Sequence, residues 1–206
     1  MSDAPSIKGS VFAGVVDEVN KHLADGTILP RDAERWLRAE DFERLDTLVV
    51  SSSWYAISSY DRLNQLLLEV VCAGDPQRLR EGGRQTARRL IDTAGFYAQL
   101  EYLQHTEVAR STDPCERYEA FGRDLTLLCS LQQSILNFSH YTPLPDPEHE
   151  RRWVIDVTEA SEFPDTLCWR ADGLINEMAR EHGEDDLWTW QRLGLDHIRW
   201  SMTRDL

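Results

Sequence analysis

The sequence has little positive charge. Its 206 residues include 22 lysines and arginines against 36 aspartates and glutamates, so the formal net charge is −14. Lysine is nearly missing, because only Lys8 and Lys21 occur and the other basic residues are arginines. Affinity for duplex nucleic acid depends on cationic contacts with phosphate groups. The charge balance therefore argues against a general nucleic-acid binder.

Long hydrophobic runs are also missing. No stretch approaches the roughly 18 apolar residues that cross a bilayer, and no hydrophobic signal segment stands near the first residue. We therefore expect a cytoplasmic protein with no membrane partner. Hydrophobic residues still make up 41% of the chain, which is enough for a single domain of this length to bury a core.

Cysteines are few and widely spaced. The four residues, Cys72, Cys115, Cys129 and Cys168, form no CxxC motif. A chain of this size does not need disulfide bonds to be stable, and no secretion signal places it in an oxidising compartment. We therefore expect four free thiols.

The motifs of several standard chemistries are missing as well. The six histidines show no HExxH or other metal-ligand spacing, and the sequence contains no G-x-S-x-G, Walker A or GxGxxG motif. His140 and His149 flank a proline-containing loop, where solvated side chains are the favoured interpretation and a surface metal site is the alternative. We expect no catalytic residues, no metal and no cofactor.

Apolar residues recur at helical spacing over most of the first two thirds of the chain. We expect a disordered leader over residues 1–7 and a helical part over residues 8–133. One long helix should begin at Asp75-Pro76, where the aspartate caps it and the proline takes the first helical position, and should reach about Leu103. Gly82-Gly83 falls inside this helix, where each glycine costs about 1 kcal/mol relative to alanine. Close packing against another backbone would explain the pair.

After residue 133 the pattern changes to the period of two that is typical of strands. It predicts four strands with one helix between the second and the third: Leu136–Ser139, Trp153–Thr158, the helix Pro164–His182, Leu187–Arg192 and Ile198–Thr203. Prolines 143, 145 and 147 predict a loop between the first two strands. The result is an α+β fold, in which an N-terminal helical subdomain packs on a four-stranded antiparallel sheet (ββαββ, residues 134–206) within one domain, 8–206.

Three groups of residues resemble a known family. They are Ile7-Lys8-Gly9-Ser10-Val11-Phe12, then Ser53-Trp54-Tyr55 followed by Tyr60-Asp61-Arg62-Leu63, then Gly74-Asp75-Pro76 with Leu79-Arg80-Glu81-Gly82-Gly83-Arg84. The family is an uncharacterised group of paralogous proteins expanded in myxobacteria. It is similar in topology to haem-nitric-oxide-binding and vinyl-reductase-type ligand domains. The resemblance implies a helical bundle on a curved antiparallel sheet that can enclose a small-molecule pocket, and it implies no activity.

Two departures from those ligand domains bear on cofactors. The domains often end in Cys-x-x-Gly-x-x-x-Cys-x-Trp, whereas the segment Gln191–Trp200 keeps the glycine and the tryptophan but has neither cysteine. The haem-binding relatives place a proximal ligand near the position of His105 and hold the haem propionates with a Tyr-x-Ser-x-Arg clamp. The nearest segment here, Phe138-Ser139-His140-Tyr141, has neither that spacing nor the arginine. An exposed histidine at a helix end is the favoured interpretation of His105.

Five residues are candidate contacts for a ligand or partner. Arg80, Arg84 and Arg88 are spaced four apart and should line one side of a helix. In an acidic chain this strip can hold an anionic ligand or an acidic protein surface. The alternative is a solvated face neutralised by neighbouring acids. Trp54 and Tyr55 precede a helix, where they can stack on the sheet or close one end of a pocket.

These observations favour a non-enzymatic protein of intracellular signalling or regulation that binds a small anionic or apolar ligand or interacts with another protein. A haem- or cofactor-bearing gas sensor is the alternative. A small enzyme on a ligand-binding scaffold is the third possibility and has the least support. The ligand, the partner and the oligomeric state are not encoded in any motif of the sequence.

Overall fold

The structure is a computed structural model that describes residues 4–92, 113–181 and 183–206. The first range contains β1 (Ser6–Lys8), α1 (Gly9–Ala24), α2 (Pro30–Trp36), α3 (Ala39–Asp46), β2 (Trp54–Ala56), α4 (Ile57–Leu66), the π-helical turn η1 (Leu67–Val71) and α5 (Pro76–Asp92). The rest contains α7 (Pro114–Gln133), β3 (His140–Pro145), β4 (Trp153–Thr158), α8 (Asp165–Glu181), β5 (Trp188–Gly194) and β6 (His197–Met202). None of the described helices is both long enough and apolar enough to cross a bilayer.

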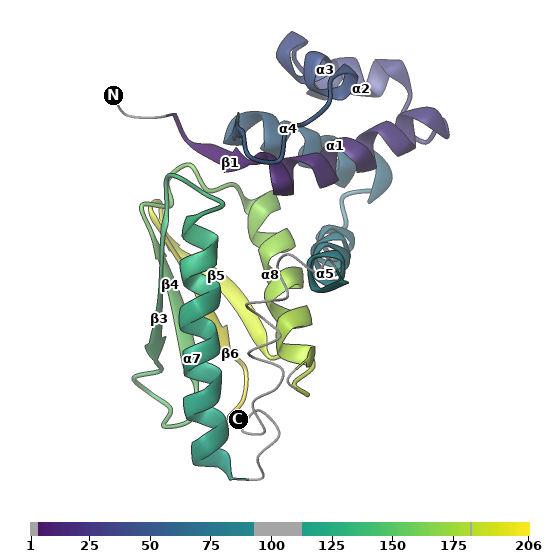
Figure 1. The fold of residues 1–206 in the computed structure, drawn as a ribbon. Helices are drawn as coiled ribbons and strands as arrows, with labels where there is room; N and C mark the ends of the chain where they lie inside the picture. Colours follow the sequence, from purple (N-terminus) through teal and green to yellow (C-terminus); the bar gives the residue numbers. More distant parts are fainter. Residues whose placement is uncertain (1–3, 93–112, 182) are drawn as a thin grey trace.

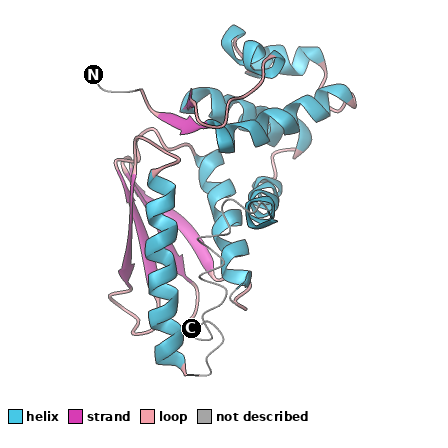
Figure 2. Cartoon of the chain, in the orientation of Figure 1, coloured by secondary structure: helices cyan, strands magenta, loops and turns pink. Residues whose placement is uncertain are grey.

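Strands β3 to β6 form one antiparallel sheet in the order β3-β4-β6-β5, with α7 and α8 packed against it (Figures 1 and 2). On β6 every second side chain is buried, among them Ile198 and Trp200, and β4 buries Val154, Ile155 and Val157. On α7, Tyr118 stacks on Trp153 of β4 with 4.9 Å between ring centroids. The predicted α+β fold is confirmed, including the helix between the second and third strands of the sheet.

The first strand of the sheet was predicted in the wrong place. Leu136–Ser139 is not a strand, and β3 covers His140–Pro145, which was predicted to be a proline loop. Pro143 pairs with Ile155 and Pro145 with Trp153. Proline has no N–H to donate to a ladder, but β3 is an edge strand and has a partner on one side only. The prolines therefore mark an edge of the sheet and do not interrupt it.

The prediction of a disordered leader is also wrong for its last two residues, Ser6 and Ile7. Ser6–Lys8 forms β1, which pairs with β2 so that Ile7 lies opposite Tyr55. Ile7 is fully buried and also forms a bridge with Leu136. Both partners are distant in the sequence, so the local pattern around residue 7 contains no sign of this strand.

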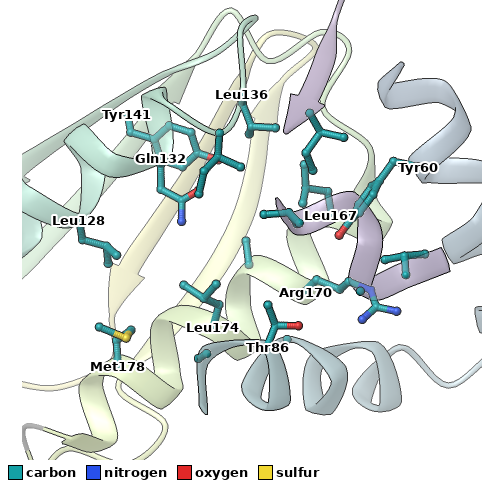
Figure 3. Close-up of a pocket in the computed structure, with 18 residues that line it drawn as sticks. Tyr60, Thr86, Leu128, Gln132, Leu136, Tyr141, Leu167, Arg170, Leu174 and Met178 are labelled. Atoms are coloured by element: carbon teal, nitrogen blue, oxygen red, sulfur yellow. The ribbon is translucent and has the colours of Figure 1, made fainter. Parts of the chain in front are cut away.

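Side chains from both parts of the chain converge where the N-terminal helices meet α7 and α8 (Figure 3). The position of α8 at this junction depends on α5, which packs along it. The helix predicted from Asp75-Pro76 is confirmed as far as Asp92, and its expected continuation to Leu103 lies outside the described residues.

Two glycines allow α5 and α8 to pack backbone against backbone. A Cβ on Gly83 would clash with the carbonyl oxygen of Arg170, and a Cβ on Gly173 would clash with the carbonyl oxygen of Arg80. Neither residue can therefore be replaced without moving a helix. The expectation that the glycine pair reflects close packing is confirmed for Gly83.

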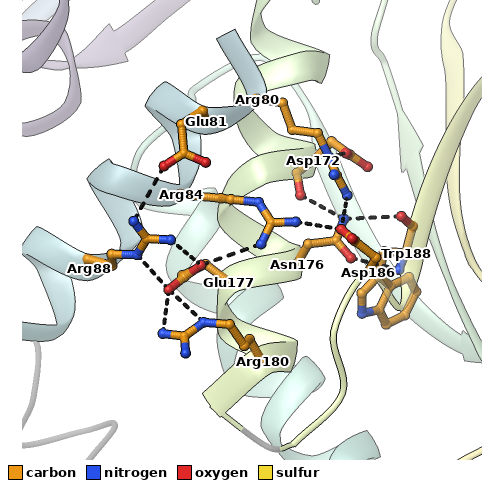
Figure 4. A network of polar contacts seen from close by, with 10 residues as sticks. All are labelled: Arg80, Glu81, Arg84, Arg88, Asp172, Asn176, Glu177, Arg180, Asp186 and Trp188. Atoms are coloured by element: carbon orange, nitrogen blue, oxygen red, sulfur yellow. Dashed lines mark hydrogen bonds and ion pairs between the residues drawn. The ribbon is translucent and has the colours of Figure 1, made fainter. Parts of the chain in front are cut away.

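The same two helices are joined by a set of ion pairs that we call the arginine ladder (Figure 4). It consists of Arg80, Arg84 and Arg88 on α5, Asp172 and Glu177 on α8, and Asp186 in the loop after α8. Arg80 donates to Asp172 and, over 2.7 Å, to Oδ1 of Asp186, which also accepts from Arg84. Arg88 Nε donates to Oε1 of Glu177 over 2.8 Å.

The ladder corrects the alternative interpretation of the arginine strip, a solvated face neutralised by neighbouring acids. The side chains of Arg80 and Arg84 are only 18% and 14% exposed, and Glu177 is fully buried. Burial alone would raise the pKa of Glu177, but hydrogen bonds from Arg88 and Arg180 and their positive charges lower that pKa to about 2. The neutralising acids were expected, but they come from α8 and the loop after it, far along the chain, and they cover Arg80 and Arg84 while Arg88 stays 46% exposed.

We expect Gly83→Ala and Gly173→Ala each to lower the free energy of unfolding by at least about 1–3 kcal/mol, because the added methyl group meets rigid backbone. Gly14→Ala in α1 is the matched control, since the nearest atom to its added Cβ is a flexible arginine tip at 3.9 Å. That control should leave stability unchanged or raise it by up to about 1 kcal/mol. Urea denaturation measures all three. A Gly83→Ala protein as stable as Gly14→Ala would contradict the close contact.

The pKa of Glu177 predicts a pH dependence of stability. The folded-state pKa of about 2 lies below the ordinary value of 4.5, so the stabilisation is complete above about pH 5 and disappears as the pH falls towards 2. We expect Glu177→Gln to cost about 3 kcal/mol at neutral pH and much less near pH 2. Denaturation series at several pH values test this, with the exposed Glu162→Gln as control. A pH-independent loss would contradict the assignment.

Candidate functional site

A cavity of about 60 Å³ lies at the junction of the two parts of the chain. Its wall is mostly apolar. Val11 and Val15 come from α1, Leu128 comes from α7, and Leu167 and Leu174 come from α8. The apolar stripes of three helices therefore meet around one space, because each stripe buries its own face against the same junction.

Two tyrosines also line the cavity, Tyr60 on α4 and Tyr141 on β3. Burial raises the pKa of the Tyr60 hydroxyl and raises that of Tyr141 well above its ordinary value. Both phenols stay protonated and uncharged at neutral pH. They are suited to donating or accepting a hydrogen bond, and they are poorly suited to proton transfer near pH 7.

Among the described residues, the cavity has one cation in its wall, Arg170 on α8, which lies at the same end as Tyr60 (Figure 3). Its side chain is only 7% exposed. Nε of Arg170 donates to the side-chain oxygen of Asn64 on α4, and Nη2 donates to Oε2 of Glu18 on α1 over 2.8 Å. A buried guanidinium is stable only when it is paired in this way. Arg170 therefore ties α8 to both N-terminal helices beside the cavity.

Sequence reasoning did not find this cluster, although a sign of it was present. Leu167, Arg170 and Leu174 follow helical spacing, so the arginine occupies a position where the pattern expects an apolar residue. Asn64 occupies a similar position on α4 and is fully buried. A polar residue inside an apolar stripe indicates a buried partner, but the spacing cannot name that partner.

None of the five predicted contact residues is among the residues that line the cavity. Arg80, Arg84 and Arg88 belong to the arginine ladder. Tyr55 stacks on Phe12 with 4.6 Å between ring centroids, and its hydroxyl accepts a hydrogen bond from the backbone of Val50.

Trp54 is 43% exposed, with Nζ of Lys8 4.0 Å from its ring centroid. Of the five candidates, Trp54 and Arg88 have the most exposed side chains. Contact of any of the five with a ligand or partner stays a prediction.

The described histidines and acids form no cluster of three or more that could hold a metal ion. His149 lies 3.2 Å from Asp146, and His140 lies 3.6 Å from Glu159, both on the surface. His140 and His149 therefore each pair with a different acid at the surface. His105, the candidate haem ligand, lies outside the described residues.

All four cysteine thiols are free, and Cys115 is the exposed one. Burial raises the pKa of Cys129 to about 12 and raises that of Cys168 further. Neither thiol forms the thiolate that nucleophilic chemistry needs. The segment Gln191–Trp200, which has neither cysteine of the related domains, spans most of the β5–β6 hairpin and carries the buried Trp200.

No family model and no curated protein sequence matches the chain. Solved structures do. An Fe(II) unliganded H-NOX protein from K. algicida superimposes with a TM-score of 0.58 and 11% identity, covering 95% of each chain. An H-NOX protein from S. oneidensis in the Fe(II)NO ligation state gives a TM-score of 0.53 and 15% identity, covering 95% of this chain and 98% of that one.

A third H-NOX structure, from work on heme distortion in that family, gives a TM-score of 0.54 and 9% identity, with 97% of each chain covered. At these identities the likeness concerns the fold alone. It confirms the expected haem-nitric-oxide-binding topology, while membership of the myxobacterial family stays a prediction. The chain has the fold of H-NOX domains over nearly its whole length.

Proposed function

We propose that this chain is a sensory domain that binds a small ligand in the cavity between its N-terminal helices and its sheet. The observation that carries the proposal is the position of the cavity. Its wall combines α1 and α4 with α7 and α8, so a ligand there touches both parts of the fold at once. A ligand that binds one packing of these parts more tightly than another shifts the population towards it.

The wall is chemically suited to binding and poorly suited to catalysis. It offers apolar side chains, two neutral phenols and one guanidinium that is already paired. Catalytic sites usually contain groups with a pKa poised for proton transfer. The described wall residues include no such group, which supports a non-enzymatic role in signalling. A cytoplasmic setting belongs to the same proposal.

A haem-bearing gas sensor is the second candidate, and the solved neighbours favour it over the haem-free expectation because they contain Fe(II). The described residues of the cavity do not fit a haem. They include no histidine or cysteine, and Arg170 is held by Glu18 and Asn64. The volume of about 60 Å³ is far below the roughly 300–1,000 Å³ of pockets for larger ligands. The haem candidate therefore depends on residues 93–112.

Purification from cells supplied with a haem precursor separates the two candidates. We expect less than stoichiometric iron and no strong visible haem band, because the described wall supplies neither a histidine nor a cysteine as axial ligand. Stoichiometric haem would establish the second candidate and make His105 the first residue to replace.

Small apolar probes test the cavity itself. Apolar cavities bind xenon, and a single xenon atom suits a cavity of about 60 Å³, so xenon under pressure should raise the melting temperature of the protein. Ala171 lines the cavity, so the larger side chain of Ala171→Leu should fill the space and abolish that rise. Ala24→Leu, on the exposed end of α1, should preserve the rise. Equal responses in the two variants would contradict binding at this site.

A further inference from the structure

The ion pair of Glu18 and Arg170 stands between two spaces. On one side is the apolar cavity, whose wall includes Arg170 and Gly83. On the other side is an open groove of about 650 Å³ between α1 and α5, whose wall includes Glu18 and Gly82. Gly14 lines both spaces. The pair therefore belongs to the wall that separates the cavity from the groove.

Around this pair the wall lacks side chains. Gly14 on α1 and Gly82-Gly83 on α5 contribute only backbone. A Cβ on Gly82 would lie 2.7 Å from Nη1 of Arg170, so the guanidinium rests directly against the bare helix. If the carboxylate of Glu18 turns away, these three glycines have no side chains that could cover Arg170 on the side of the groove.

The two members of the pair are held unequally. Arg170 is 7% exposed and is also fixed by Asn64, whereas Glu18 is 33% exposed. Glu18 is already partly solvated, so its carboxylate can turn into water more easily than the Arg170 guanidinium can. Arg170 cannot be left without an anion, because an unpaired buried charge is strongly destabilising. Displacement of Glu18 therefore requires a ligand that brings its own negative group.

The remaining groove residues favour an anion of modest size. Lys21, Arg88 and Arg89 line the groove together with two acids, Asp17 and Glu18. Once Glu18 has turned away, Asp17 is the one acid left among the described residues that line the groove. The cavity behind Arg170 is apolar and holds about 60 Å³, roughly the liquid volume of two water molecules. That space suits a tail of a few carbon atoms.

We propose that the groove and the cavity form one site for a short-chain carboxylate. Its carboxylate replaces that of Glu18 on Arg170, and its alkyl tail passes between the glycines into the apolar cavity. This assignment rests on the proposed ligand-binding function and names the class of ligand. Glu18 is then a built-in competitor that keeps Arg170 neutralised until the ligand arrives.

Calorimetric titration with acetate, butyrate and butan-1-ol tests the assignment. Butyrate should bind more tightly than acetate, by roughly three- to fourfold for each methylene buried. Butan-1-ol, which lacks the charge, should bind more weakly than butyrate. Glu18→Gln replaces the competing carboxylate by an amide and should strengthen butyrate binding about tenfold while leaving butan-1-ol unchanged.

Asp17→Asn is the matched control, because it removes the same charge from the same groove without touching Arg170. It should change butyrate affinity less than twofold. Glu18→Asp keeps the charge on a shorter side chain and should give an intermediate gain, which preserves the test if Glu18→Gln folds poorly. Thermal unfolding of each variant verifies folding.

Two outcomes would overturn the assignment. One is an equal change of butyrate affinity in Glu18→Gln and Asp17→Asn, which would mean that Glu18 acts only through the net charge of the groove. The other is butyrate binding no tighter than butan-1-ol. In either case a xenon response that Ala171→Leu abolishes would preserve the proposed ligand-binding function. Loss of that response as well would end both proposals.

Discussion

The contact between α5 and α8 is the constraint on which the rest of the structure depends. Gly83 and Gly173 bring the two backbones together, and the arginine ladder joins the same helices along their lengths. Close packing and ion pairing support each other here. Because the helices touch, the carboxylates of Asp172 and Glu177 are buried, and burial strengthens their interaction with the guanidinium groups.

This contact positions the residues around the cavity. α8 carries Arg170 on the turn that meets Gly82 and Gly83, so the arginine is directed towards α1 and α4. The same helix presents Leu167 and Leu174 to the cavity. A shift of α8 along α5 would therefore move the polar end and the apolar wall of the site together. The cavity therefore lies between the N-terminal helices and α7 and α8, so a bound ligand contacts both parts of the fold.

Periodicity predicts much of this fold and little of the site. The strands Trp153–Thr158 and Ile198–Thr203 follow from local alternation, because each buries one face against helices. β3 could not be predicted in the same way, because its prolines are tolerated only at a sheet edge and the edge is a property of the whole sheet. β1 is likewise stabilised by residues far along the chain.

The arginine strip shows the same limit in the site. The spacing of Arg80, Arg84 and Arg88 correctly places them on one helix face, yet their partners follow 89 to 106 residues later, in α8 and the loop after it. A strip that is solvated and a strip that is packed have the same local sequence. The ion pair of Arg170 and Glu18 could not be predicted for the same reason, because each residue's partner lies in another helix.

A crystal structure under xenon pressure, on protein purified from haem-supplied cells, tests the central claim most directly. The claim is that this H-NOX fold encloses a small apolar cavity that binds a ligand without haem. We expect a xenon atom between Val15, Leu128 and Leu174, because apolar cavities of this kind stay dry and take up xenon. A haem in that place, or a cavity without xenon, would contradict the claim.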